Sequence, residues 1–263
     1  MSKKHSGGLW KLQKSIREAN IELNIDELFD FLEKREAVRN GESFDDDVLM
    51  NSKILNVFRE HDKTSVWIED NVQGDPFEYF WWCRWINRID VLTQFFPDKV
   101  LPDGPISNQS AYQLNPSLAK GFGYKKMREV FEKELPNLWK DVEVAYRESN
   151  SLEEAAYSMN KAFGGRSQFV MFQIAIDMAK HENDLDMLRS RPYYGTGSNN
   201  FVNEIHYEEI LEAVKRDKPS WVIREVFPFD VENWLCEYRK YRIRQINGIP
   251  KNRNYKGNKQ KLF

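Results

Sequence analysis

Two glycines followed by polar residues form the stretch of this sequence that is best suited to holding a phosphate group. Gly164 and Gly165 interrupt a helical pattern, and they are followed directly by Arg166, Ser167 and Gln168. A glycine turn beside a helix N-terminus exposes backbone N–H groups, and such groups bind phosphate oxygens. The arginine adds a positive charge there, and the two residues after it add neutral donors. We therefore predict a phosphate contact at this turn.

Two carboxylates lie about one helix length beyond the turn, at Asp184 and Asp186. The layout resembles the hairpin of the DNA glycosylase superfamily, in which an Asp at a similar distance after the hairpin serves the flipped base. The resemblance implies a carboxylate that stabilises the positive charge as the glycosidic bond breaks and orients an attacking water. On this hypothesis Asp186 is the first candidate for the catalytic residue, and Asp184 is the second. The alternative is an ordinary helical corner with two surface carboxylates, because Gly-Gly turns are common in proteins.

The residues on either side of the turn are typical of two helices. Ser151 is expected to cap the first helix, and Glu154 three residues later completes a capping box. Beyond the turn, Phe169, Phe172 and Ile176 recur at helical spacing on one apolar face. We expect a helix, a tight turn, a second helix and a short acidic loop, in that order.

A polar cluster lies upstream, where Arg59, Asp62 and Lys63 are flanked by apolar residues on both sides. A cluster of charges is usually a solvated face of a protein. Because the flanking residues are typical of a core, a partly buried polar pocket is the other interpretation.

Residues 76–96 are expected to form one helix with a stripe of large apolar residues along it. Arg84, Asn87 and Arg88 are expected to share a neighbouring face of that helix, at spacings of three and four residues. An arginine beside so many rings indicates either a structural cation–π contact or a contact with a nucleotide. Residues 97–124 are rich in Pro, Gly, Asn and Ser, and we expect a long loop there.

The composition limits the classes of protein to consider. The 263 residues suffice for one large domain or two helical lobes, and the net charge of −2 gives no global attraction to nucleic acid. Cys83 and Cys236 form no C-x-x-C pair and the four histidines are scattered, so no zinc site is expected. No apolar run indicates a signal region or a membrane span. We expect a soluble cytoplasmic monomer with no cofactor, no metal and no membrane partner.

The chain divides into three predicted parts. Residues 1–48 form an N-terminal helical extension, residues 49–247 a helical domain, and residues 248–263 a basic tail. Lys251 and Arg253 belong to this tail, which is either a phosphate-binding arm or merely a soluble terminus. No internal repeat is evident, and a lone G-x-G that follows no strand excludes a dinucleotide-binding fold.

Four stretches together resemble one protein family. In order, they are NVFREHDKTSVWI, FWWCRWINRI, FGGRSQFVMFQIAIDM and DVENWLCEYRKY. They resemble the alpha-glutamyl/putrescinyl thymine pyrophosphorylase family, which includes the helical domain associated with hydroxymethyluracil-DNA kinase. The resemblance extends from about Asn51 to Tyr255. It implies an all-α, helix-hairpin-helix DNA glycosylase-like fold with two helical lobes and a cleft between them.

The resemblance also implies a partner, which is double-stranded phage DNA carrying modified pyrimidines. One implied activity is a glycosylase that flips out and excises glucosylated hydroxymethylcytosine or a hydroxymethyluracil derivative, leaving an abasic site as an anti-phage defence. A second is a transferase that displaces pyrophosphate from activated hydroxymethyluracil with an amine or amino acid. A third is a non-catalytic DNA-binding partner of a hydroxymethyluracil-DNA kinase.

The implied site combines residues from several of these stretches. The base pocket is expected to contain Arg59, Asp62, Lys63, Arg84, Asn87, Gln173, Asp177 and Tyr194. Ser167 lies near the position where glycosylases that form a Schiff base carry a lysine, so a lyase step is not expected. Two further departures from the family pattern are the segment at 193–197, which replaces a proline-glycine-rich turn, and Arg239, which replaces an acidic residue.

Overall fold

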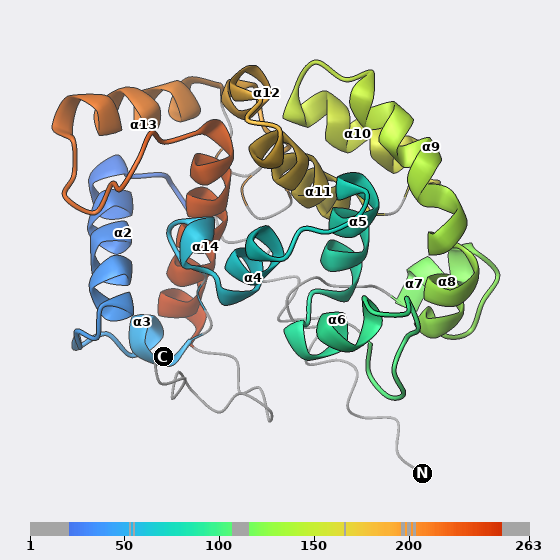
Figure 1. Cartoon of the computed structure of the whole chain (residues 1–263). Coiled ribbons are helices and arrows are strands. Elements are labelled where there is room, and N and C mark those ends of the chain that lie inside the picture. The colour runs from blue at the N-terminus through green and yellow to red at the C-terminus, as the bar shows by residue number, and fades with distance from the viewer. Residues whose placement is uncertain are drawn as a thin grey trace, which may run out of the picture. The chain divides into compact units, whose positions relative to one another are not determined.

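The computed structural model describes residues 21–52, 54, 56–106, 116–165, 167–195, 198, 201 and 204–248, without the side chains of 116, 117 and 204–206. Every regular element within these ranges is a helix, as Figure 1 shows. They comprise thirteen α-helices and one short 3₁₀ helix. The all-α fold expected from the sequence is therefore confirmed.

The chain separates into two compact units, and each unit is built from segments that are not contiguous in the sequence. The first unit comprises Met1–Val57, Tyr194–Val226 and Asp230–Phe263. The second comprises Phe58–Tyr193 and Phe227–Phe229. The three-part domain division expected from the sequence stays a prediction.

The first unit is held together by aromatic side chains of its longest helix. Phe31 stacks on Tyr241 with ring centroids 4.8 Å apart, and Trp234 donates its indole N–H to the Val57 carbonyl at 2.8 Å. Asn24 caps the first of the helices by accepting the Glu27 N–H. The helices of this unit are α2 (Ile25–Arg39), α3 (Asp47–Asn51), α13 (Glu204–Asp217) and α14 (Pro228–Asn247), the last of which begins with two residues of the second unit.

The second unit is built around one buried helix. α11 (Gln168–His181) packs against α5 (Pro76–Ile86) and α10 (Leu152–Ala162). Ten consecutive residues of α11, from Val170 to Ala179, are buried, as expected for a helix that is apolar nearly all round. The remaining elements are η1 (Arg59–His61), α4 (Lys63–Asp70), α6 (Ile89–Phe95), α7 (Pro116–Gly121), α8 (Met127–Lys133), α9 (Leu135–Arg147) and α12 (Leu185–Arg189).

The expectation of one helix over residues 76–96 is wrong, because the chain breaks at Asn87. This residue adopts the left-handed conformation, with φ 47° and ψ 39°, and its N–H closes α5 on the Cys83 carbonyl at 2.8 Å. Asparagine tolerates this conformation better than most residues. Arg88 follows the break and pairs with Asp90 rather than lying on the face of Arg84. The loop expected at 97–124 also contains a helix, α7.

The helix–turn–helix expected around the two glycines is present as α10, a turn and α11. Ser151 accepts the Glu154 N–H at 3.1 Å and so caps α10, as the sequence predicts. At the other end, the Gly164 N–H bonds the Lys161 carbonyl at 3.0 Å and the Gly165 N–H bonds the Asn160 carbonyl at 2.7 Å. This pair of bonds is a Schellman closure, which needs a left-handed residue after the helix. Gly164 supplies it, with φ at +89°.

Replacing Gly164 by alanine is expected to lower the free energy of unfolding by about 1–2 kcal/mol, because an L-residue is strained in the left-handed region. Urea denaturation of purified variants measures this loss. Gly121, the last residue of α7, is the control, since a Gly→Ala change at a helical position stabilises by up to about 1 kcal/mol. A Gly164→Ala variant as stable as the parent would contradict the Schellman closure.

Candidate functional site

A buried ion network occupies the centre of the second unit. Asp177 lies on α11 with its side chain fully buried, and it accepts hydrogen bonds from two arginines. Arg84 of α5 donates to one carboxylate oxygen through Nε and to the other through Nη2, the latter at 2.8 Å. Arg59 of η1 donates through Nη2 at 2.6 Å. The carboxylate therefore joins three elements that are far apart in the sequence.

Two neutral side chains complete the network. Gln173 lies one helical turn before Asp177 on α11, so both face the same side, and its oxygen accepts a bond from Arg59 Nη1. The Ser65 hydroxyl of α4 accepts from Arg84 at 3.3 Å and 3.4 Å. The structure thus brings together Arg59, Arg84, Gln173 and Asp177, all four of which the sequence assigned to a base pocket.

The charge on Asp177 is held by its partners. Burial acts to raise the pKa of this carboxyl group, but the Arg84 and Arg59 guanidinium groups outweigh burial and leave the pKa below its usual range. A carboxylate that is neutralised twice over is a poor acceptor for a further proton. Its role in this geometry is to position arginine side chains rather than to act as a base.

Arg59 is the member of the network that reaches the surface. Its side chain is 13% exposed, against 2% for Arg84 and 0% for Asp177. Its Nε atom is buried and makes no hydrogen bond within the described residues, whereas Nη1 and Nη2 each donate one N–H to the network and keep a second. A guanidinium group has five N–H donors, so Arg59 keeps donors for an anionic or carbonyl group of a ligand.

The side chains of the other residues assigned to the base pocket make no contact with Asp177 that the structure describes. Asp62 caps α4 by accepting the Ser65 N–H at 2.8 Å, and Lys63 is exposed at the start of that helix. Asn87 is buried, and its side-chain oxygen has no hydrogen-bond partner in the described structure. Tyr194 belongs to the first unit, where its ring meets the edge of Tyr207.

The glycine turn differs from the expected phosphate contact. The N–H groups of Gly164 and Gly165 are both used in the Schellman closure, and the Ser167 N–H donates to the Asn160 side chain at 2.7 Å. These three donors are therefore engaged within the protein. Gln168 begins α11. The remaining predicted DNA contacts, Arg166, Lys251 and Arg253, lie outside the described residues.

The two predicted catalytic carboxylates differ in their surroundings. Asp184 caps α12 by accepting the Met187 N–H at 2.9 Å. Asp186 is exposed on that helix, and it makes no hydrogen bond or ion pair with any residue that the structure describes. Both follow the C-terminal end of α11, whereas the glycine turn precedes its N-terminal end. The 14 residues of α11 separate the turn and the carboxylates by about 20 Å.

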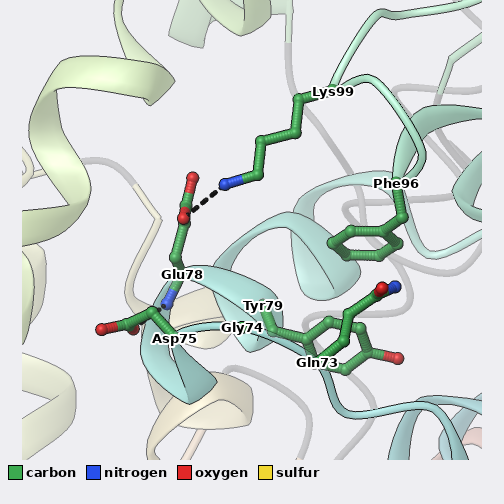
Figure 2. A pocket seen from close by; sticks show the side chains of 7 residues that line it. All are labelled: Gln73, Gly74, Asp75, Glu78, Tyr79, Phe96 and Lys99. Carbon is green, nitrogen blue, oxygen red and sulfur yellow. Dashed lines mark hydrogen bonds and ion pairs between the residues drawn. The ribbon is translucent and has the colours of Figure 1, made fainter.

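A pocket of about 130 Å³ lies at the N-terminal end of α5 (Figure 2). Tyr79 and Phe96 stack there with centroids 4.7 Å apart, and Lys99 pairs with Glu78 at 2.6 Å. The residues that line it are Gln73, Gly74, Asp75, Glu78, Tyr79, Phe96 and Lys99. None of them belongs to the base pocket or to the DNA contacts expected from the sequence, and the pocket lies at the opposite end of α5 from Arg84.

A buried acid in the first unit escaped the sequence analysis. Glu232 of α14 is 4% exposed and accepts hydrogen bonds from the Ser198 hydroxyl at 2.8 Å and the Gly195 N–H at 3.4 Å. Burial raises the pKa of its carboxyl group to about 7, and nearby Glu237 adds to this effect. The sequence offers no signal for this burial, because an acid near the start of a helix is ordinarily explained by the helix dipole.

No protein family, curated protein or solved structure matches this chain. Across the described residues, every helix is too short or too polar to span a lipid bilayer. In the same part of the chain, no three His, Cys, Asp or Glu side chains gather closely enough to hold a metal ion. Cys83 and Cys236 are free thiols.

Replacing Arg84 by methionine is expected to lower the free energy of unfolding by about 3–5 kcal/mol, because Asp177 would keep a buried charge with one partner removed. Urea denaturation measures the loss. The double variant R84M/D177N removes that charge and should recover part of the stability. R88M is the control, since the exposed Arg88–Asp90 pair contributes about 1 kcal/mol at most. Equal losses in R84M and R88M would contradict the proposed importance of the network.

Replacing Glu232 by glutamine is expected to remove a pH dependence of stability. The native state favours the protonated acid, so its stabilising contribution is full below the ordinary pKa of 4.5 and is lost as pH rises through about 7. Relative to the parent, E232Q should therefore gain stability from about pH 5 to about pH 8, by as much as about 3 kcal/mol. Urea denaturation at the two pH values measures it.

The exposed Glu42 provides the control for this pH experiment, through an E42Q variant that makes the same chemical change at the surface. The difference between E42Q and the parent should be the same at both pH values. If E232Q also showed no change with pH, Glu232 would not be a buried acid with a raised pKa.

Proposed function

We propose that this protein excises a hypermodified pyrimidine from DNA by hydrolysing its N-glycosidic bond, on a helix-hairpin-helix glycosylase-like fold. The observation that supports this proposal best is the arrangement along α11. The hairpin turn precedes this helix, Gln173 and Asp177 hold Arg59 at its middle, and Asp186 follows its end. One rigid element thus connects all three parts that a base-excising enzyme requires.

In this proposal Arg59 recognises the extruded nucleotide. Its guanidinium group is fixed by Asp177 and Gln173 and keeps unused donors, so it is organised before the substrate arrives. Such donors suit the carbonyl groups and sugar hydroxyls of a glucosylated base. Enzymes that act on a base in duplex DNA flip that nucleotide out of the stack to reach it.

Asp186 supplies the carboxylate, because Asp184 is engaged as a helix cap and Asp177 is paired with two arginines. The bond between C1′ and the base nitrogen breaks, and its electron pair leaves with the base. Water adds to C1′ while Asp186 stabilises the positive charge on the sugar and accepts the proton of the water. Ser167 offers no amine near the turn, so the product is an abasic site without strand cleavage.

The distance along α11 constrains how DNA would lie. A strand advances about 3.4 Å per nucleotide, so the separation of about 20 Å between turn and carboxylate corresponds to about six nucleotides. A phosphate at the hairpin is therefore not the neighbour of the flipped nucleotide. The contact at the turn would set the register of the duplex, and Arg59 and Asp186 would act further along it.

Transfer of an amine or amino acid onto an activated hydroxymethyluracil is a second candidate. The observation that favours it is the second N–H that Nη1 and Nη2 of Arg59 each keep, since guanidinium groups bind phosphate oxygens in pairs and suit a pyrophosphate leaving group. In this reaction the glycosidic bond remains intact and the base gains an adduct. The two reactions therefore yield different nucleosides.

Duplex DNA carrying glucosylated hydroxymethylcytosine is expected to acquire alkali-labile sites when it is incubated with the purified protein. An Asp186→Asn variant should lose this activity by at least about 100-fold, because its amide cannot accept the proton or balance the charge. Asp141→Asn on the exposed face of α9 is the matched control and should retain full activity. Gel electrophoresis after alkali treatment measures the cleavage.

Mass spectrometry of the same reactions identifies the product. A free modified base supports excision, whereas an intact nucleoside with a new adduct, formed from pyrophosphorylated DNA and an amine, supports transfer. The absence of both products on all modified substrates would contradict an enzymatic role for this site and favour a DNA-binding partner without catalysis.

A further inference from the structure

Two helices of the second unit end in the same turn with a shared sequence pattern. α7 ends in Lys120-Gly121-Phe122-Gly123 and α10 ends in Lys161-Ala162-Phe163-Gly164. In α7, Gly123 donates to the Lys120 carbonyl at 3.0 Å and Tyr124 donates to the Ala119 carbonyl at 2.8 Å. This is the same Schellman closure that ends α10, and Gly123 is likewise left-handed, with φ at +81°.

The two turns lie against each other. The rings of Phe122 and Phe163, which occupy the same position in each turn, have centroids 5.4 Å apart. Phe163 also packs on Trp81 and Trp85 of α5, with centroids 5.6 Å and 4.9 Å away. Both turns are therefore fixed to the core through their phenylalanine rings, and they bring the residues at matching positions, Lys120 and Lys161, near each other.

The surface at these turns carries positive charge. Four lysines of the two turns and the segment after the first, Lys120, Lys125, Lys126 and Lys161, are exposed, and we call them the paired-turn patch. Within the described residues none of the four side chains makes an ion pair or a hydrogen bond. The whole chain has a net charge of −2, so this concentration of lysines is local.

Two acids lie beside the patch, and each already has another partner than the lysine side chains of the patch. Glu129 accepts the Lys126 backbone N–H at 3.1 Å and lies 3.8 Å from Lys133. Glu134 accepts the Tyr124 hydroxyl at 2.6 Å. The charges of the patch are thus left for an anion from outside the protein.

Helix stability accounts for only half of the patch. Lys120 and Lys161 lie in the last turns of their helices, where the helix dipole favours a cation. Lys125 and Lys126 directly precede α8, where the dipole disfavours a cation. Their position opposes helix stability, so an external anion gives them a reason to be there.

The glycines make close approach easy. A Cβ atom built at Gly123, Gly164 or Gly165 would meet no atom within 4 Å, so the backbone of both turns faces open space. A nucleic-acid strand can approach the backbone closely at these glycines, because they carry no side chain. Both the charge and the shape of this surface are complementary to a phosphate backbone.

We propose that the paired-turn patch binds the phosphates of duplex DNA, with both turns contacting the backbone through lysine side chains instead of glycine N–H groups. This inference rests on the proposed function only in taking DNA as the ligand. In this proposal the turn after α7 binds DNA together with the hairpin turn. Lysine side chains take the place of the backbone N–H groups, which are already hydrogen-bonded in the Schellman closures. The contact is independent of base sequence, as expected for an element that sets register.

Binding of an unmodified fluorescent duplex, measured by anisotropy between about 50 and 200 mM salt, tests the patch. The variants K120Q/K161Q and K125Q/K126Q should each bind about tenfold more weakly, and each should reduce the slope of log K against log salt by about 2. The control K34Q/K215Q makes the same change in charge at two lysines that pair with acids in the first unit, and it should bind as the parent does. Urea denaturation confirms that each variant is folded.

The outcomes separate this inference from the proposed function. If the parent does not bind DNA, or if both lysine variants bind with the affinity and slope of the parent, the patch is not a DNA contact. If those variants bind normally and still excise bases, the excision proposal is supported and the proposed DNA contact at the patch is contradicted. If the lysine variants alone lose binding while the parent excises nothing, the patch stands and excision falls.

Discussion

The second unit depends on the compensation of one buried charge. An ionised carboxylate without partners inside an apolar core costs several kcal/mol, and Asp177 lies in the middle of a helix that is otherwise nearly all apolar. Arg84 and Arg59 must therefore reach it from α5 and η1. Because the arginine contacts require a defined geometry, this one carboxylate fixes the register of three elements.

That constraint has a consequence for recognition. Arg84 is consumed by the network, whereas Arg59 is held by Asp177 and Gln173 and still has donors to spare. A guanidinium group that is immobilised in advance loses little freedom when it binds a ligand. The buried Asp177 thus orients Arg59, which reaches the surface, and the proposed roles of the residues along α11 follow from this contact. In the proposed function, the residues at the two ends of α11 would serve backbone contact and chemistry, and those at its middle would serve recognition.

Structural features that depend on a few neighbouring residues could be predicted from the sequence, whereas contacts between distant residues could not. The Ser151 cap and the glycine turn were predictable because each depends on a few neighbouring residues. The break at Asn87 was not, since the apolar pattern continues across it and the turn depends on one residue adopting a left-handed conformation. Likewise, no sequence spacing reveals that Glu232 is buried, or that two short K-x-F-G segments meet through their phenylalanine rings.

The central claim is that a fixed Arg59 faces one extruded nucleotide while the duplex is held elsewhere along the same helix. A crystal structure of the inactive Asp186→Asn variant with a duplex carrying glucosylated hydroxymethylcytosine tests this most directly. The account predicts the modified nucleotide outside the stack, within hydrogen-bond distance of Arg59, with its C1′ beside Asn at position 186. A modified base that remains stacked, or one that is extruded away from Arg59, would contradict the account.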